Sequence, residues 1–149
     1  MNNISRMLPH DYPMVLIDNI KEYDPENRFI VAEVTIRERM PFYDKTINGM
    51  TSVVGIEFMA QTIGCYSYLK RKERQPKMGF LLGTRMYNNS IEFYEKSKKY
   101  TIRAEEIYND SKLCAFGCQI FDERQEEIAC ATINAYQPDN IEEILKADE

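Results

Sequence analysis

The 149-residue sequence has no apolar run near the roughly 20 residues that a membrane-spanning helix requires. Its opening residues also lack the charged and then apolar pattern of a signal peptide. It contains no internal repeat and no linker rich in glycine, serine or proline. We therefore expect no membrane span, no export, and one domain over residues 1–149.

Basic charge and paired cysteines are scarce as well. The formal net charge of -5 argues against a nucleic-acid partner, because domains that bind nucleic acids carry a basic surface. The four cysteines (Cys65, Cys114, Cys118 and Cys130) form no Cys-x-x-Cys pair. Each lies in an apolar stretch, where a free thiol behaves as a small hydrophobic side chain. We therefore expect no disulfide, no metal ion or other cofactor, and a cytoplasmic location.

Strands are predicted on both sides of the chain's middle. Met14–Tyr23 is the first, followed by a polar turn at residues 24–27. Phe29–Arg37 follows, and its apolar residues alternate as in a half-buried strand. The later predicted strands are Met78–Tyr87, Tyr100–Tyr108, Leu113–Phe121 and Ile128–Tyr136.

A long helix is predicted between these strands. Thr51 or Ser52 can act as its N-cap, and the helical pattern runs to about Lys72. Few polar side chains interrupt the pattern, and a helix that is apolar on all sides is buried. Two strands, one buried helix and four strands are typical of an α+β fold, in which a curled antiparallel sheet wraps the helix.

Glu57 is the most distinctive side chain of this predicted helix. At about 3.6 residues per turn, Val53, Glu57 and Gly64 share one face. Glu57 is thus a carboxylate on an apolar face, one turn after a helix N-terminus whose N–H groups at Thr51–Val54 could bind an oxyanion. The position suits a group that gives and takes protons, or a buried glutamate that hydrogen-bonds to backbone or to Gln61.

The motifs around Glu57 resemble a known family. Leu8–Asp18 resembles the opening of the FabZ-type β-hydroxyacyl-acyl-carrier-protein dehydratases, and Ile56–Gln61 resembles their central-helix motif, in which the glutamate is catalytic. Leu82–Arg85 and Phe116–Gln119 are similar to two later strands of the family. The resemblance implies a hotdog fold, in which a curled antiparallel β-sheet wraps one long central helix.

One family residue is missing from its usual place. The active-site histidine normally lies in a Gly-His-Phe-Pro segment before the helix, but Pro41–Met50 contains no histidine. This departure and the closing Ala135–Asp139 segment are similar to the ApeP-like subfamily, which is associated with aryl-polyene lipid synthesis. His10 is the only histidine, and the resemblance places it near the substrate tunnel, so we expect it to replace the missing one. It could instead be a polar residue of a turn bounded by prolines.

The resemblance implies dehydration of a β-hydroxyacyl thioester, carried by an acyl carrier protein, to the trans-2-enoyl thioester in fatty-acid or aryl-polyene-type lipid synthesis. Glu57 and His10 are the expected catalytic residues, with Tyr43 and Asp44 as further candidate acids, and Tyr12 is a third candidate donor or acid. The expected substrate-binding residues are Tyr12, Ser52, Val53 and Gly83. Gly83 would allow the acyl chain to approach the backbone, although a strand bulge would also explain a glycine there.

Two other functions remain open at this stage. A hotdog thioesterase would use the helix carboxylate and would need no histidine. A non-catalytic acyl-binding subunit would need neither the carboxylate nor a histidine. Five cations between Lys70 and Lys77 form either a solvated helix end or a docking surface for an acidic carrier. The open edges of a curled sheet predict a homodimer or higher homo-oligomer. The family resemblance implies that His10 and Glu57 lie near its interface.

Overall fold

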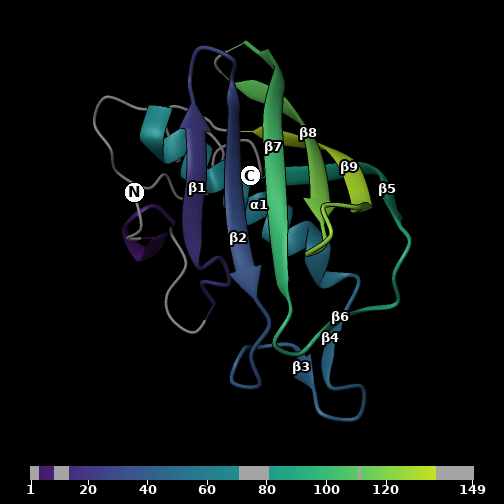
Figure 1. The fold of residues 1–149 in the computed structure, drawn as a ribbon. Coiled ribbons are helices and arrows are strands. Elements are labelled where there is room, and N and C mark those ends of the chain that lie inside the picture. The colour runs from purple at the N-terminus through teal and green to yellow at the C-terminus, as the bar shows by residue number, and fades with distance from the viewer. Residues whose placement is uncertain (1–3, 9–13, 71–80, 111, 137–149) are drawn as a thin grey trace, which may run out of the picture.

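The computed structural model describes residues 4–8, 14–70, 81–110 and 112–136. Most of this chain is β-structure around one long helix (Figure 1). The elements are a 3-10 helix (Ile4–Arg6), β1 (Asn19–Asp24), β2 (Phe29–Thr35), β3 (Tyr43–Asp44), β4 (Gly49–Thr51), α1 (Val54–Lys70), β5 (Leu81–Asn89), β6 (Phe93–Glu95), β7 (Lys99–Asn109), β8 (Leu113–Phe121) and β9 (Glu127–Tyr136).

Six strands form one antiparallel sheet in the order β1-β2-β7-β8-β9-β5. The sheet curls in front of α1 in Figure 1, while β3, β4 and β6 form a small second sheet at one end of the molecule. In β2 and β8 every second residue is buried, because successive side chains of a strand point to opposite faces. The predicted α+β architecture, a curled antiparallel sheet around one helix, is confirmed.

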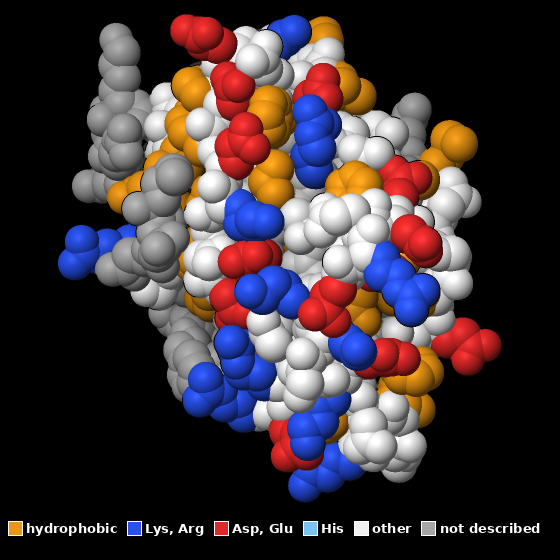
Figure 2. Space-filling model, viewed as in Figure 1, with side chains coloured by type: hydrophobic (Ala, Val, Ile, Leu, Met, Phe, Trp, Pro, Cys, Tyr) orange, Lys and Arg blue, Asp and Glu red, His pale blue; other side chains and the backbone are white. Residues whose placement is uncertain are grey.

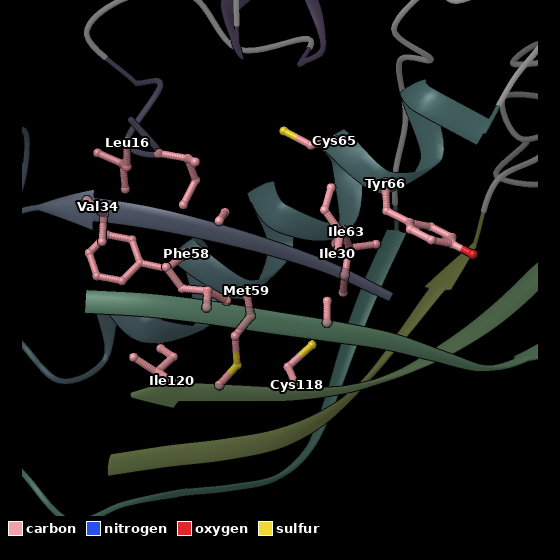
Figure 3. Close-up of a cluster of buried hydrophobic side chains, with 14 of the residues drawn as sticks. Leu16, Ile30, Val34, Phe58, Met59, Ile63, Cys65, Tyr66, Cys118 and Ile120 are labelled. Atoms are coloured by element: carbon pink, nitrogen blue, oxygen red, sulfur yellow. The ribbon is translucent and has the colours of Figure 1, made fainter. Parts of the chain in front are cut away.

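The inner face of the sheet and one side of α1 form the core. In Figure 3, Phe58, Met59 and Ile63 of α1 point toward Ile30 of β2 and Ile120 of β8. The four cysteines are free, and burial raises the pKa of the Cys65 and Cys118 thiols to about 12. These two thiols are therefore protonated at neutral pH and pack as small apolar side chains.

The outer face of the sheet is polar. Figure 2 shows acidic and basic side chains interspersed over it, and Arg103 Nη1 lies 2.8 Å from Glu105 Oε2 on β7. Polar side chains are expected on this face, because every second residue of each strand points away from the core. Within the described residues, no helix has the length and apolar character needed to cross a membrane.

The helix is not buried on all sides, so that expectation was wrong for the described chain. Val53 is 68 % exposed, and Ile56, Glu57 and Ala60 are only partly buried. The reason is geometric: a sheet that curls around one side of a helix leaves the other side uncovered. The N-terminal segment covers part of it, because a Cβ added to Gly64 would lie 2.6 Å from the Leu8 side chain.

The first strand is shorter than predicted, since β1 begins at Asn19 rather than Met14. Residues 14–16 bond to the helix instead. The Leu16 N–H donates to Gln61 Oε1 at 2.8 Å, and Gln61 Nε2 donates to the Met14 carbonyl at 2.7 Å. The Gln61 side chain thus bonds to backbone groups that would otherwise pair with a neighbouring strand. The alternation of apolar residues in the sequence cannot show such a contact.

The short strands β3, β4 and β6 were not predicted either. They have two or three residues each, too few for an alternating pattern to be visible. Gly49 is required in β4 because an added Cβ would overlap the Tyr94 backbone carbonyl oxygen. This close approach joins β4 to β6 and places the chain directly before α1.

We predict that Gln61→Met loosens residues 14–16. The variant removes the partners of the Leu16 N–H and the Met14 carbonyl, which should lower the free energy of unfolding by about 2–4 kcal/mol. Hydrogen exchange of the Leu16 amide should change from slow to fast, and chemical denaturation measures the stability.

Thr62→Val is the matched control. Thr62 is equally buried, but its hydroxyl bonds only to the Phe58 carbonyl of its own helix, so the loss should stay near 1 kcal/mol. Leu16 should remain protected in this variant. Equal Leu16 exchange in both variants would contradict the anchoring role of Gln61.

Candidate active site

Glu57 lies in the first turn of α1, on the side that the sheet leaves partly uncovered. Its Oε1 accepts a hydrogen bond from Gln61 Nε2 at 3.1 Å. The two residues are four apart, so their side chains are neighbours on one helix face. The hydrogen bond between Glu57 and Gln61 that the sequence left open is therefore present, and Glu57 as a whole is partly buried.

Gln61 links Glu57 to the N-terminal segment. Its side chain is completely buried, and its amide bonds to Glu57, to the Met14 carbonyl and to the Leu16 N–H. Asp18 holds the other end of this segment, because its carboxylate accepts bonds from the Thr35 N–H and from Arg37 Nη1, each at 2.7 Å. Residues 14–18 are therefore fixed relative to Glu57.

The sequence did not single out Gln61 or Asp18 as positioning residues. A signal for Gln61 was available: a glutamine within an apolar helix must find partners for its amide once it is buried. Nothing in the local sequence indicates the partners of Asp18, since β2 supplies them.

The start of α1 carries two backbone donors. The Gly55 and Ile56 N–H groups donate to the Ser52 and Val53 carbonyls at 3.1 and 3.2 Å. In the described part of the chain, the Val53 and Val54 N–H groups have no hydrogen-bond acceptor. Val53 is also one helical turn from Glu57. The structure thus brings Ser52, Val53 and Glu57 together at one end of the helix.

The other predicted site residues do not join this group. His10 and Tyr12 lie outside the described residues. Gly83 is exposed on β5, and an added Cβ would meet no described atom within 4 Å. The bulge of β5 lies further along, between Arg85 and Asn88. Neither close approach nor a bulge at Gly83 is seen in the single chain, and its role in substrate binding stays a prediction.

The two further candidate acids differ in their surroundings. Asp44 is held by the Thr46 hydroxyl at 2.6 Å and by the Thr46 N–H at 2.9 Å. These two hydrogen bonds lower the pKa of Asp44, and the bond from the hydroxyl has the larger effect. The carboxyl group is therefore ionised at neutral pH and is a poor proton donor. Tyr43 lies on β3, opposite Met50 of β4.

A family model and several solved structures are similar to this chain. The family model of the ApeP-like proteins, described as ApeP dehydratase, matches residues 2–146. A solved structure titled "The Dehydratase Heterocomplex ApeI:P from Xenorhabdus doucetiae" matches with 25 % identity and a TM-score of 0.86, over 98 % of this chain and 97 % of that chain. The E. coli PaaI protein shares the fold at 9 % identity and a TM-score of 0.59, over 79 % of this chain and 81 % of its own.

Curated relatives match more locally. The 3-hydroxyacyl-[acyl-carrier-protein] dehydratase FabZ of Acetivibrio thermocellus is 37 % identical over 84 residues, 54 % of this chain and 56 % of the relative. FabZ of Chlamydia trachomatis serovar D is 31 % identical over 87 residues, 56 % of this chain and 57 % of the relative. The chain spans about half the length of these relatives. Since the family model covers nearly all of the sequence, the chain belongs to the ApeP-like dehydratase family.

Proposed function

We propose that this protein dehydrates a β-hydroxyacyl thioester to the trans-2-enoyl thioester, with Glu57 as a catalytic residue. One observation carries the proposal: the carboxylate of the partly buried Glu57, held by a buried amide, stands one turn beyond two backbone donors. Membership of a dehydratase family agrees with this reaction. The acyl carrier protein in the printed name of the FabZ relatives supports a carrier-bound substrate.

The reaction needs three groups. A base removes the α-proton, an acid protonates the β-hydroxyl, and the α-C–H and β-C–O bonds break as water leaves and the double bond forms. Donors hold the thioester oxygen, which gains negative charge as the α-proton departs. Each well-placed proton transfer contributes about 10²–10⁴-fold, and one oxyanion donor about 10²–10³-fold. Glu57 exchanges one proton, and the Val53 and Val54 N–H groups hold the oxygen.

His10 is the proposed partner of Glu57. It stands four residues before Met14, whose carbonyl accepts a bond from the same Gln61 amide that holds Glu57. Four residues span at most about 14 Å, so His10 lies no further than that from Met14. Histidine is the side chain that exchanges protons most readily near neutral pH. Tyr12, in the same segment, is proposed to line the substrate site.

The first test is to incubate the protein with a β-hydroxyacyl pantetheine thioester and to weigh the products. Loss of water supports the dehydratase, free thiol identifies a thioesterase, and unchanged substrate identifies an acyl-binding subunit. Glu57→Gln should lower turnover by more than about tenfold, because glutamine keeps the volume and hydrogen bonding but exchanges no proton.

Glu22→Gln is the control for that variant, since Glu22 is exposed on β1 and far in sequence from α1. It should retain the wild-type rate. Circular dichroism should show an unchanged fold for both variants. Dehydration by Glu57→Gln within about tenfold of wild type would rule out a catalytic role.

We also propose that the chain works as a dimer of hotdog subunits in the cytoplasm. Strand β5 forms an edge of the six-stranded sheet over nine residues, and long exposed edges are commonly paired or covered. Met86 on this strand is 80 % exposed. The similar Xenorhabdus doucetiae structure is a heterocomplex of dehydratases, which makes a second hotdog chain the proposed partner. The free cysteines suit a reducing compartment.

Light scattering at micromolar concentration should give the mass of a dimer or a multiple of it. If His10 and Glu57 of one site come from different subunits, mixing inactive His10→Ala and Glu57→Gln proteins should restore part of the activity. A stable monomer would contradict the assembly. A dimer without rescue would place both residues in one subunit or remove His10 from the reaction.

The basic cluster at Lys70–Lys77 is proposed to receive the carrier protein. Lys70 itself is engaged, because its Nζ lies 3.0 Å from Oε1 of the buried Glu106. The other cations of the cluster lie outside the described residues. Docking would therefore depend on them, and rim charges act mainly on the association rate.

Reversing Arg71 and Lys72 to glutamate should raise KM for carrier-bound substrate about threefold or more, and the effect should shrink as salt rises. A small pantetheine thioester should react normally. Reversal of the exposed Lys21 and Arg124 changes the net charge equally and serves as control. Equal impairment with both substrates would make the cluster structural, and no effect would make it an ordinary solvated helix end.

A further inference from the structure

A tyrosine from β5 reaches the start of α1. The Tyr87 hydroxyl donates to the Ser52 carbonyl oxygen at 2.5 Å. The same oxygen accepts the Gly55 N–H at 3.1 Å. The Ser52 carbonyl is therefore held from two sides, by the first turn of its own helix and by a strand that comes 35 residues later.

The Ser52 carbonyl and the Val53 N–H belong to the same peptide unit. A trans peptide is planar, and its C=O and N–H bonds point in opposite directions. With the oxygen fixed on Tyr87, the Val53 N–H must point away from Tyr87. Because the Ser52 oxygen also accepts the Gly55 N–H, this peptide is aligned with the helix axis, and the Val53 N–H points out of the N-terminal end of the helix. Glu57 lies one turn further along the helix from Val53.

A bulge in β5 brings Tyr87 to this position. The register of β5 against β9 shifts between Arg85 and Asn88, and Met86 between them has φ 55. A positive φ is costly for a side chain such as methionine, and bulges often serve to redirect a neighbouring side chain. Met86 points to solvent at 80 % exposure, and Tyr87 turns toward the helix.

Gly55 leaves the space that the hydroxyl occupies. A Cβ added there would lie 2.5 Å from the Tyr87 oxygen and would also overlap the Tyr94 hydroxyl. Burial raises the pKa of Tyr87, so the hydroxyl keeps its proton at neutral pH and can donate it to the carbonyl.

We propose that Tyr87 is a positioning residue that orients the Val53 N–H toward the thioester oxygen of the substrate. This inference rests on the proposed dehydration at Glu57. Tyr87 bonds to the Ser52 backbone carbonyl and would act through it. Its loss should weaken the stabilisation of the negative charge that develops during the reaction, while leaving the binding of the uncharged thioester nearly unchanged.

Tyr87→Phe tests the proposal by removing only the hydroxyl. We expect kcat for a β-hydroxyacyl pantetheine thioester to fall roughly 10- to 100-fold, with KM within about threefold of wild type. Tyr94→Phe is the comparison variant: it removes a second hydroxyl beside Gly55, which interacts with the Tyr87 hydroxyl but does not bond to Ser52, so its kcat should fall by less. Similar kcat values in the two variants would overturn the proposal.

A second measurement does not depend on turnover. Protein labelled with 15N-valine is titrated with an acyl pantetheine thioester that lacks the β-hydroxyl. The Val53 amide proton should shift downfield in the wild type and in Tyr94→Phe, and the shift should be lost in Tyr87→Phe. A wild-type Val53 that does not respond would overturn the inference.

The two measurements separate the inference from the proposed reaction. If the wild type releases no water but shows the Tyr87-dependent shift, the orientation of Val53 stands and the dehydratase proposal fails. If the wild type releases water and Tyr87→Phe behaves like it in both measurements, only the role of Tyr87 fails. Should Tyr87→Phe not fold, Gly55→Ala displaces the same hydroxyl and must lower kcat selectively.

Discussion

The buried amide of Gln61 is the interaction on which the arrangement of the candidate site depends. It joins the Met14 carbonyl, the Leu16 N–H and the Glu57 carboxylate within one set of hydrogen bonds. An amide without partners in the core costs about 1–3 kcal/mol, so these contacts are maintained together or lost together. The position of Glu57 is therefore coupled to that of the N-terminal segment, and the segment takes a path along the helix rather than extending β1.

The unequal burial of α1 is the second determinant. The curled sheet covers Phe58, Met59 and Ile63, while the side with Val53 and Glu57 is left partly open. A helix that was covered on all sides could not present a carboxylate to a substrate. The same helix supplies backbone donors at its first turn, so the Glu57 carboxylate and these N–H groups lie within a few residues of each other.

The site also draws on strands that are distant in the sequence. Tyr87 of β5 holds the Ser52 carbonyl, and Gly49 of β4 allows the close approach of β6 that places the chain before α1. Asp18 depends on Thr35 and Arg37 in the same way. Each contact is a single polar or steric constraint between segments that are distant in the sequence.

The sequence by itself determined the α+β class, most of the strands and the helix, because alternation and helical periodicity are local consequences of burying one face of each element. It also identified Glu57, as a charged residue in an apolar helix, and the family. Only the tertiary structure decided which side of α1 remains open, where β1 begins, and that Gln61 and Tyr87 bond to the segments on either side of the start of α1. The open side of α1 depends on how the sheet curls, and the other features depend on hydrogen bonds between residues 35 to 47 positions apart, whose partners a linear pattern does not indicate.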